Sequence, residues 1–490
     1  MAIARPAWRA STCSRSGSRF MSTTRAICRG RKLIRSYKRF AAIAAAVLCS
    51  GSAFAQSNAD RIIDYELANS RAYETLSHLT DNIGPRLSGS KNAGLAVTWT
   101  TKTLRDWGLN AQNQAVMVPH WVRGVEHGSL VSHNDQKIVL TALGGSIATP
   151  ANGITADVIE VASYDELAKL GRAKIAGKIV FYNRAMDMQM VESGQAFAAY
   201  SEAVEFRSTG ASHAAEYGAV ASVIRSVASA SLRTPHTGAM RYDEKQPKIP
   251  AAAMTTEDAD LVHRLLAKGE RVRLHLVLTP KTLPDVESAN VIAEIRGSEH
   301  PDEVVLIGGH LDSWDLGTGA IDDGAGAVMV METLRVLKEL GIQPKRTIRG
   351  VLFMNEENGL RGGHKYFDTA AAREEVHKHI AAIETDAGAA PPVGFITTLE
   401  GAALSRMQIR ARVLSRIAPI VFTSSKHTGA DTSPLTDAGV PGFGLVPDPR
   451  HYFDFHHTPA DTLDKIDPKA LAQNTAALAA LAYLIAEDGL

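Results

Sequence analysis

The chain has 490 residues, of which 45% are hydrophobic and 21% are charged, with 39 Gly and 20 Pro. This ordinary globular composition excludes a collagen-like, a coiled-coil or a wholly disordered chain. The first 55 residues hold 11 of the 53 Lys and Arg residues and none of the 52 Asp and Glu residues, so the other 435 carry a formal charge of −10. That charge, without any basic run, argues against nucleic-acid binding.

Residues 1–55 have the pattern of a secretory signal peptide. A basic stretch, 29–39, precedes an apolar stretch, 40–50, that is too short to span a bilayer, and Ala53-Phe54-Ala55 is a small-x-small cleavage pattern. We therefore expect cleavage after Ala55, with Met21 as an alternative start. The pattern predicts a secreted or periplasmic protein, without stable membrane insertion after cleavage.

The cysteines all lie before the predicted cleavage point, at Cys13, Cys28 and Cys49. The mature protein then has no thiol. This excludes disulfides, thiolate metal ligands and a cysteine nucleophile.

The remaining chain changes character twice. Residues 58–110 have apolar residues at helical spacing, whereas 120–280 alternate short β-branched runs with Gly-rich turns. From residue 290 to the end, strands alternate with helices, which predicts an α/β fold with a mostly parallel, doubly wound sheet. We predict residues 56–120 as the first part of a catalytic domain, 121–280 as an inserted β-rich domain and 281–490 as the rest of the catalytic domain.

Imidazoles and carboxylates come directly after the predicted strands of this last region. Ligands of such sheets gather outside the carboxyl ends of the strands, so these groups are candidates for one site. The segments are Gly308–Ser313, Gly319–Gly326, Asn355–Gly359, Glu384–Gly388 and Phe455–Thr462.

Histidine and carboxylate ligands without cysteine suit zinc, and a catalytic zinc keeps one position for water. A pair of zinc ions about 3.5–4 Å apart needs a bridging carboxylate. Asp312, two residues from His310, could accept the second N–H of that imidazole. Glu356 and Glu357 are adjacent, so one can bind metal while the other acts as general base.

These segments resemble the di-zinc exopeptidases of the bacterial leucyl aminopeptidase and aminopeptidase S family, and within it the carboxypeptidase Q branch. The resemblance extends over nearly all of the mature chain, including Gly84–Ser90 and the inserted segment, which is similar to a protease-associated domain. It implies a zinc exopeptidase fold, a peptide substrate, two Zn²⁺ per chain and a homodimer. It also implies a cis peptide bond between Asp322 and Asp323.

By position, the resemblance assigns a role to each candidate residue. His310 and Asp386 bind one zinc, Glu357 and His457 bind the other, and Asp322 bridges the two. Glu356 is the general base, and Asp312 orients His310. The implied metal ligands are thus His310, Asp322, Glu357, Asp386 and His457, and the implied catalytic residues are Glu356 and Asp312.

One position departs from the family pattern. Relatives often carry Tyr immediately before the last His, where it can donate to the developing oxyanion, and this chain has His456 there. The donor is then His456, Tyr452 or a zinc ion alone. His456 also remains an alternative to His457 as the metal ligand, although the following Thr-Pro-Ala-Asp favours His457.

The resulting hypothesis is an exported di-zinc metallo-exopeptidase, most similar to a dipeptidase acting on short peptides with unblocked ends. An aminopeptidase acting on longer peptides is the first alternative. A receptor-like binding module without activity and a single-zinc glutaminyl cyclase are two others, and the complete ligand set argues against both. The sequence leaves open which terminus of the substrate is recognised.

Overall fold

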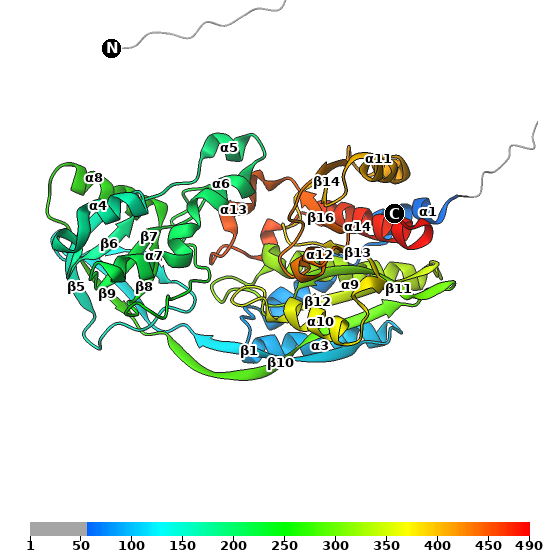
Figure 1. The fold of residues 1–490 in the computed structure, drawn as a ribbon, viewed down its shortest axis with the longest axis horizontal. Coiled ribbons are helices and arrows are strands. Elements are labelled where there is room, and N and C mark those ends of the chain that lie inside the picture. The colour runs from blue at the N-terminus through cyan, green and yellow to red at the C-terminus, as the bar shows by residue number, and fades with distance from the viewer. Residues whose placement is uncertain (1–55) are drawn as a thin grey trace, which may run out of the picture. The chain divides into compact units, whose positions relative to one another are not determined.

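Two eight-stranded sheets organise the chain in the computed structural model, which describes residues 56–490 (Figure 1). The predicted leader, residues 1–55, lies outside the described residues. The order in the first sheet is β1 (Gln112–Val122), β10 (Lys281–Ile295), β12 (Arg346–Phe353), β11 (His300–His310), β13 (His379–Glu384), β16 (Gly442–Pro447), β14 (Pro392–Thr397) and β15 (Val421–Ser424). The order in the second sheet is β3 (Gln136–Ile138), β2 (Glu126–Leu130), β9 (Arg273–Leu278), β5 (Ile154–Val161), β6 (Ile179–Tyr182), β7 (Ala221–Arg225), β8 (Ala251–Met254) and β4 (Leu140–Ala142).

The four middle strands of the first sheet, β12, β11, β13 and β16, are parallel. The pairs β1–β10, β10–β12 and β14–β16 are antiparallel, and β15 is parallel to β14. The fold is therefore a mixed α/β fold with a parallel centre, as the alternating pattern predicts. Register places the last residues of β11, β12 and β13 at one edge of the sheet, because His310 pairs with Phe353 and Gly308 pairs with Glu384.

Helices cover both faces of this sheet. They are α1 (Asn58–Asn69), α2 (Ala72–Ser77), α3 (Lys91–Asp106), α9 (Ala325–Glu339), α10 (Arg361–Ala372), α11 (Gly401–Arg410), α12 (Ser433–Asp437), α13 (Tyr452–Phe455) and α14 (Pro468–Asp488). Alternate residues of β12 show the two faces: Ile348 and Leu352 join the core under α9, whereas Val351 and Phe353 join a second core with Tyr366 of α10.

Local sequence signals begin several of these helices. Ser57 accepts a hydrogen bond from the Asp60 amide at the start of α1, and Ser90 does the same for Ala93 at the start of α3. Asp467 caps α14, which starts with Pro468. Among the described residues α14 alone is long and apolar enough to cross a membrane, but 83% of its apolar window is buried inside the protein.

Residues between β1 and β10 build the second sheet together with α4 (Tyr164–Ile175), α5 (Met188–Glu192), α6 (Ala196–Ala203), α7 (Glu205–Glu216) and α8 (Thr256–Ala267). Within this segment α6 and α7 are consecutive helices that are separated only by Val204. Residues 56–490 form one compact unit, so the predicted division at 120 and 280 stays a prediction.

Candidate metal centre

The predicted ligands come from the ends of three neighbouring strands and from two loops. His310 ends β11, Glu357 comes after β12 and Asp386 comes after β13. Asp322 lies in the turn that leads into α9, and His457 lies just beyond α13. The parallel register therefore brings together residues that are up to 147 positions apart in the chain.

Asp322 lies at the centre of this group. Its Oδ1 is 3.2 Å from Nε2 of His310, and its Oδ2 is 3.1 Å from Nε2 of His457. Asp386 lies on the His310 side, with 3.6 Å between Oδ1 and Nε2, and Glu357 lies on the His457 side, with 3.0 Å between Oε2 and Nε2. Each oxygen of Asp322 thus faces an imidazole that also contacts one further carboxylate.

His456 also contacts the centre. Its Nε2 is 3.4 Å from Asp322 Oδ2, and its ring stacks on that of His457 with 3.5 Å between centroids. The geometry therefore brings both histidines of the pair to Asp322. His457 differs in that it also faces Glu357 and donates from Nδ1 to the Thr237 carbonyl, 3.3 Å away.

The chemistry of these donors fits divalent cations. Asp322 Oδ2 is buried and has no hydrogen bond within residues 56–490. Buried charges of one sign are costly unless a cation compensates them. Burial lowers the pKa of His310, but Asp386 and Asp322 outweigh it and raise that pKa well above its ordinary value. Burial raises the pKa of Glu357 to about 7, with the Asp322 charge adding to the shift. A divalent cation would compensate the buried carboxylates, and these ligands lose their protons when it binds.

Asp312 acts differently from the expectation. Its carboxylate is 3.8 Å from His310 Nδ1, too far for a hydrogen bond, and its backbone carbonyl accepts from that nitrogen at 3.0 Å. Asp312 Oδ1 instead accepts from the backbone amides of Asn355 and Glu356, at 2.7 and 3.1 Å. The carboxylate therefore fixes the segment after β12, and the main chain orients the imidazole.

The two adjacent glutamates point to different places. Glu357 accepts a hydrogen bond from the Trp314 amide at 3.0 Å and faces His457, whereas Glu356 lines the cleft beside the ligands. Asn355, just before them, has a φ of 77°, a left-handed conformation that is uncommon outside glycine. This turn separates the two carboxylates.

The turn that carries Asp322 is fixed by hydrogen bonds to Asp461. The peptide bond between Asp322 and Asp323 is cis, as the resemblance implies. Asp461 accepts from the amides of Ala320, Ile321 and Asp322, at 2.9, 2.7 and 3.2 Å. These bonds place Asp322 independently of any ligand.

Arg86, within the Gly84–Ser90 turn, has a structural role that the sequence does not reveal. Its guanidinium is fully buried and donates to the carbonyls of Leu311, Thr318 and Gly319, at 2.6, 2.6 and 2.9 Å. Arg86 therefore connects the loop after His310 to the turn before Asp322.

A cleft of about 490 Å³ opens over this centre. One wall carries Asp322, Glu356, Glu357 and Asp386, and the other comes from the segment between β1 and β10. Its lining also includes Phe197, Tyr200, Arg207, Arg241, Tyr452 and Phe453. Sequence reasoning did not identify Tyr200 or Arg207, because each occupies an ordinary helical position.

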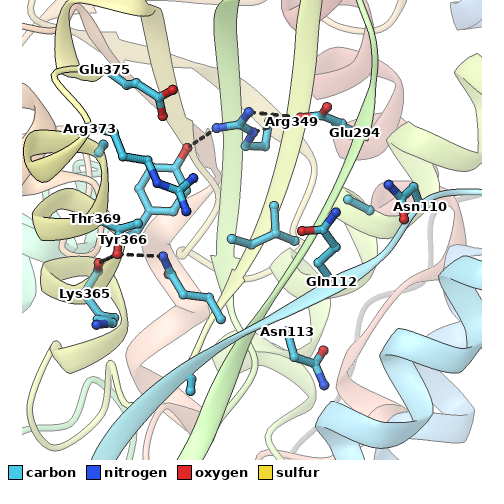
Figure 2. A pocket seen from close by; sticks show the side chains of 15 residues that line it. Asn110, Gln112, Asn113, Glu294, Arg349, Lys365, Tyr366, Thr369, Arg373 and Glu375 are labelled. Carbon is cyan, nitrogen blue, oxygen red and sulfur yellow. Dashed lines mark hydrogen bonds and ion pairs between the residues drawn. The ribbon is translucent and has the colours of Figure 1, made fainter.

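A larger cavity, of about 620 Å³, lies between β1, β10, β12 and α10 and contains none of the predicted site residues (Figure 2). Arg349 lines it, but its guanidinium already pairs with Glu294 at 3.0 Å and donates to the Tyr366 hydroxyl at 3.1 Å. Size alone therefore does not make this cavity the reactive site, and the smaller cleft holds the reactive groups.

Comparisons with known proteins find peptidases that are similar to this chain. The model of "Peptidase family M28" matches residues 290–482. Carboxypeptidase Q of Mus musculus is 41% identical over 426 residues, which cover 86% of this chain and 87% of the relative. Aminopeptidase YwaD of Bacillus subtilis is 24% identical over 426 residues, 85% of this chain and 84% of that protein.

Solved structures are similar as well. A peptidase M28 precursor from Shewanella amazonensis has a TM-score of 0.84 and 39% identity, covering 88% of this chain and 96% of that one. BSAP, a zinc aminopeptidase from Bacillus subtilis, has a TM-score of 0.61 at 21% identity, covering 85% of this chain and 95% of that one. The second likeness concerns the fold alone.

Proposed function

Because this chain belongs to peptidase family M28, a family of metallopeptidases, we propose that it is an exported exopeptidase that hydrolyses short peptides with two zinc ions. The observation that carries the proposal is Asp322, whose two oxygens face His310 and His457 at 3.2 and 3.1 Å. Asp386 and Glu357 complete the two halves. We assign His310, Asp322 and Asp386 to one ion, and Glu357, Asp322 and His457 to the other.

When bound, the zinc ions would polarise the scissile carbonyl and lower the pKa of water to about 7. Glu356 then takes the proton from the attacking water and delivers it to the leaving amine nitrogen. Burial raises the pKa of Glu356 well above its ordinary value, and this favours a carboxyl that can hold the proton between the two steps. The Asp312 carboxylate positions Glu356 through its backbone amide.

The cleft supports a small substrate with apolar side chains. Phe197 stacks on Tyr452, with 5.3 Å between ring centroids, and Phe453 packs against both. The name of the carboxypeptidase Q relatives supports a substrate with a free carboxyl end, whereas that of YwaD supports aminopeptidase activity as the alternative.

Export and dimerisation complete the proposal. The leader pattern of residues 1–55 supports secretion or transfer to the periplasm, and the N-terminal residue of the exported protein tests it, with Gln56 expected. The mass in solution by light scattering tests the homodimer. A protein that keeps Met1 or Met21, or that has the mass of one chain, would contradict the respective part.

The reaction itself is tested with Glu356→Gln. We expect this variant to fold and to contain two zinc ions per chain, as the wild type does, but to lose at least about a hundredfold in kcat on dipeptides, the lower range for removal of a general base. Glu400→Gln, an exposed change of the same kind, is the matched control. A Glu356→Gln enzyme with wild-type kcat, or a wild type with no bound zinc, would refute the assignment.

A further inference from the structure

Arg207 brings a positive charge into the cleft from the second sheet's side of the molecule. It lies in the first turn of α7 and lines the same cleft as Asp322, Glu356 and His457. Its Nη1 is 3.5 Å from Nδ1 of His457. A guanidinium therefore lies next to the proposed metal ligands.

The guanidinium has few partners among the residues that the structure describes. Among residues 56–490, no carboxylate lies within 4.0 Å of it, although other arginines in clefts or cores here are paired, such as Arg123 with Asp315. Nη1 donates to the Tyr200 hydroxyl, and Nε is buried and has no hydrogen-bond partner in the described part of the chain. Because Nδ1 of His457 donates a hydrogen bond to the Thr237 carbonyl, this nitrogen cannot also accept one from Arg207. Most of the five guanidinium N–H donors are thus unused.

The surrounding residues hold Arg207 in this position. Its guanidinium carbon lies 5.4 Å from the centre of the Tyr200 ring, and Tyr200 in turn stacks on Phe453. Gly238 packs directly against the guanidinium, since a Cβ at that position would lie 2.5 Å from Nη1. A fixed, unpaired guanidinium is suited to recognise a carboxylate with two parallel hydrogen bonds.

The short distance between Arg207 and His457 limits how many substrate residues fit between the guanidinium and the scissile bond. One residue beyond the scissile bond spans about 3.5 Å, and each further residue adds the same length. Because Arg207 contacts the imidazole of His457, an anion bound to it lies close to the scissile bond. This position suits the terminal carboxylate of a single residue after that bond.

We propose that Arg207 binds the free α-carboxylate of the residue after the scissile bond, so that the enzyme releases one C-terminal residue at a time and acts best on dipeptides. This inference rests on the proposed function and adds the group that recognises the substrate end. Tyr200 is the positioning residue for Arg207. Arg241, an exposed cation at the same cleft, is the competing candidate.

The experiment compares Leu-Leu with Leu-Leu amide, which differ only in the terminal charge. We expect the wild type to prefer the free acid, and Arg207→Gln to lose at least about thirtyfold in kcat/KM on Leu-Leu, mostly through KM. Activity on the amide should change less than about threefold. Arg207→Lys should recover part of the loss, because it keeps the charge without the planar fork.

Binding gives a second readout. In the Glu356→Gln background, the Kd of Leu-Leu measured by calorimetry should weaken by a similar factor on addition of Arg207→Gln, whereas the Kd of the amide should not. Arg184→Gln, on the same segment and paired only with exposed Glu202, is the matched control. Zinc content and Tm confirm that each variant is folded.

Three results would overturn the proposal. They are equal hydrolysis of acid and amide by the wild type, an equal loss on both substrates in Arg207→Gln, or a loss on Leu-Leu in Arg241→Gln with none in Arg207→Gln. An inactive wild type, or an active Glu356→Gln variant, would instead refute the proposed function. The two failures are therefore distinguishable.

Discussion

Arg86 and Asp461 shape the metal centre without touching its proposed ligand atoms. Arg86 donates hydrogen bonds to three carbonyls around the turn that carries Asp322, and Asp461 accepts hydrogen bonds from three amides of the same turn. Buried groups of this kind are expensive to remove, because each partner left behind lacks a hydrogen bond in a place that water does not reach.

Arg86→Met tests this at the level of one side chain. Loss of three buried hydrogen bonds should lower the free energy of unfolding by about 3–5 kcal/mol and reduce zinc content, since Asp322 would no longer be held. Thermal unfolding and elemental analysis measure the two effects. Arg271→Met is the control, because Arg271 is 73% exposed at its side chain. An Arg86→Met protein with unchanged Tm would contradict this role.

At the scale of elements, the loop after β11 packs tightly against the segment between β1 and β10, which contains the second sheet. Trp314 covers Gly144, where an added Cβ would lie 1.9 Å from the indole ring. The Trp314 amide also donates to Glu357. The position of one proposed ligand therefore depends on a close contact between residues 170 positions apart.

Gly144→Ala should displace the indole and cost about 1–3 kcal/mol of stability, with loss of activity, as overpacking of a core does. Gly94→Ala is the matched control, because Gly94 is exposed within α3 and nothing lies near its missing Cβ. That change should stabilise the protein by about 0.5–1 kcal/mol. Chemical denaturation of both variants checks the difference in sign, and equal effects would contradict it.

The elements of the parallel centre were predictable, because β11, β12 and β13 are buried apolar runs bounded by Gly and polar residues. The long antiparallel pair β1 and β10 was not predicted, since β10 has exposed residues over its first half and begins inside a Pro-containing stretch. The candidate ligands were predictable from the polar residues at the end of each strand. Arg207 and Tyr200 were not, because their role depends on which helix faces the cleft, a tertiary property with no local signal.

The stability of the whole molecule depends in part on one buried acidic residue outside the cleft. Glu66 of α1 is completely buried, and neither of its carboxylate oxygens has a hydrogen-bond partner among residues 56–490. Burial, and then the charge of Glu332 on α9, raise the pKa of Glu66 to about 9. Glu66 is therefore protonated in the folded protein at neutral pH.

This pKa predicts a loss of stability in alkali. The folded state binds the proton more tightly than the unfolded state, whose pKa is near 4.5, so the contribution of Glu66 is full below that pH and is lost as the pH rises through about 9. Glu66→Gln imitates the protonated form and should remove the loss, on the order of 6 kcal/mol by pH 9. The Tm difference between wild type and Glu66→Gln, measured from pH 6 to 9, should widen with pH. A constant difference would contradict the assignment.

The contact between Thr237 and His457 has a consequence for any attempt to shorten this protein. The Thr237 amide donates to the His457 carbonyl at 3.0 Å, and the Thr237 carbonyl accepts a hydrogen bond from Nδ1 of His457 at 3.3 Å. A trimmed enzyme without residues 123–280 would lose the clamp on one of its own ligands. The smallest working version of this peptidase thus has to retain both sheets. Loops far from Thr237 and His457 are the better places for engineering.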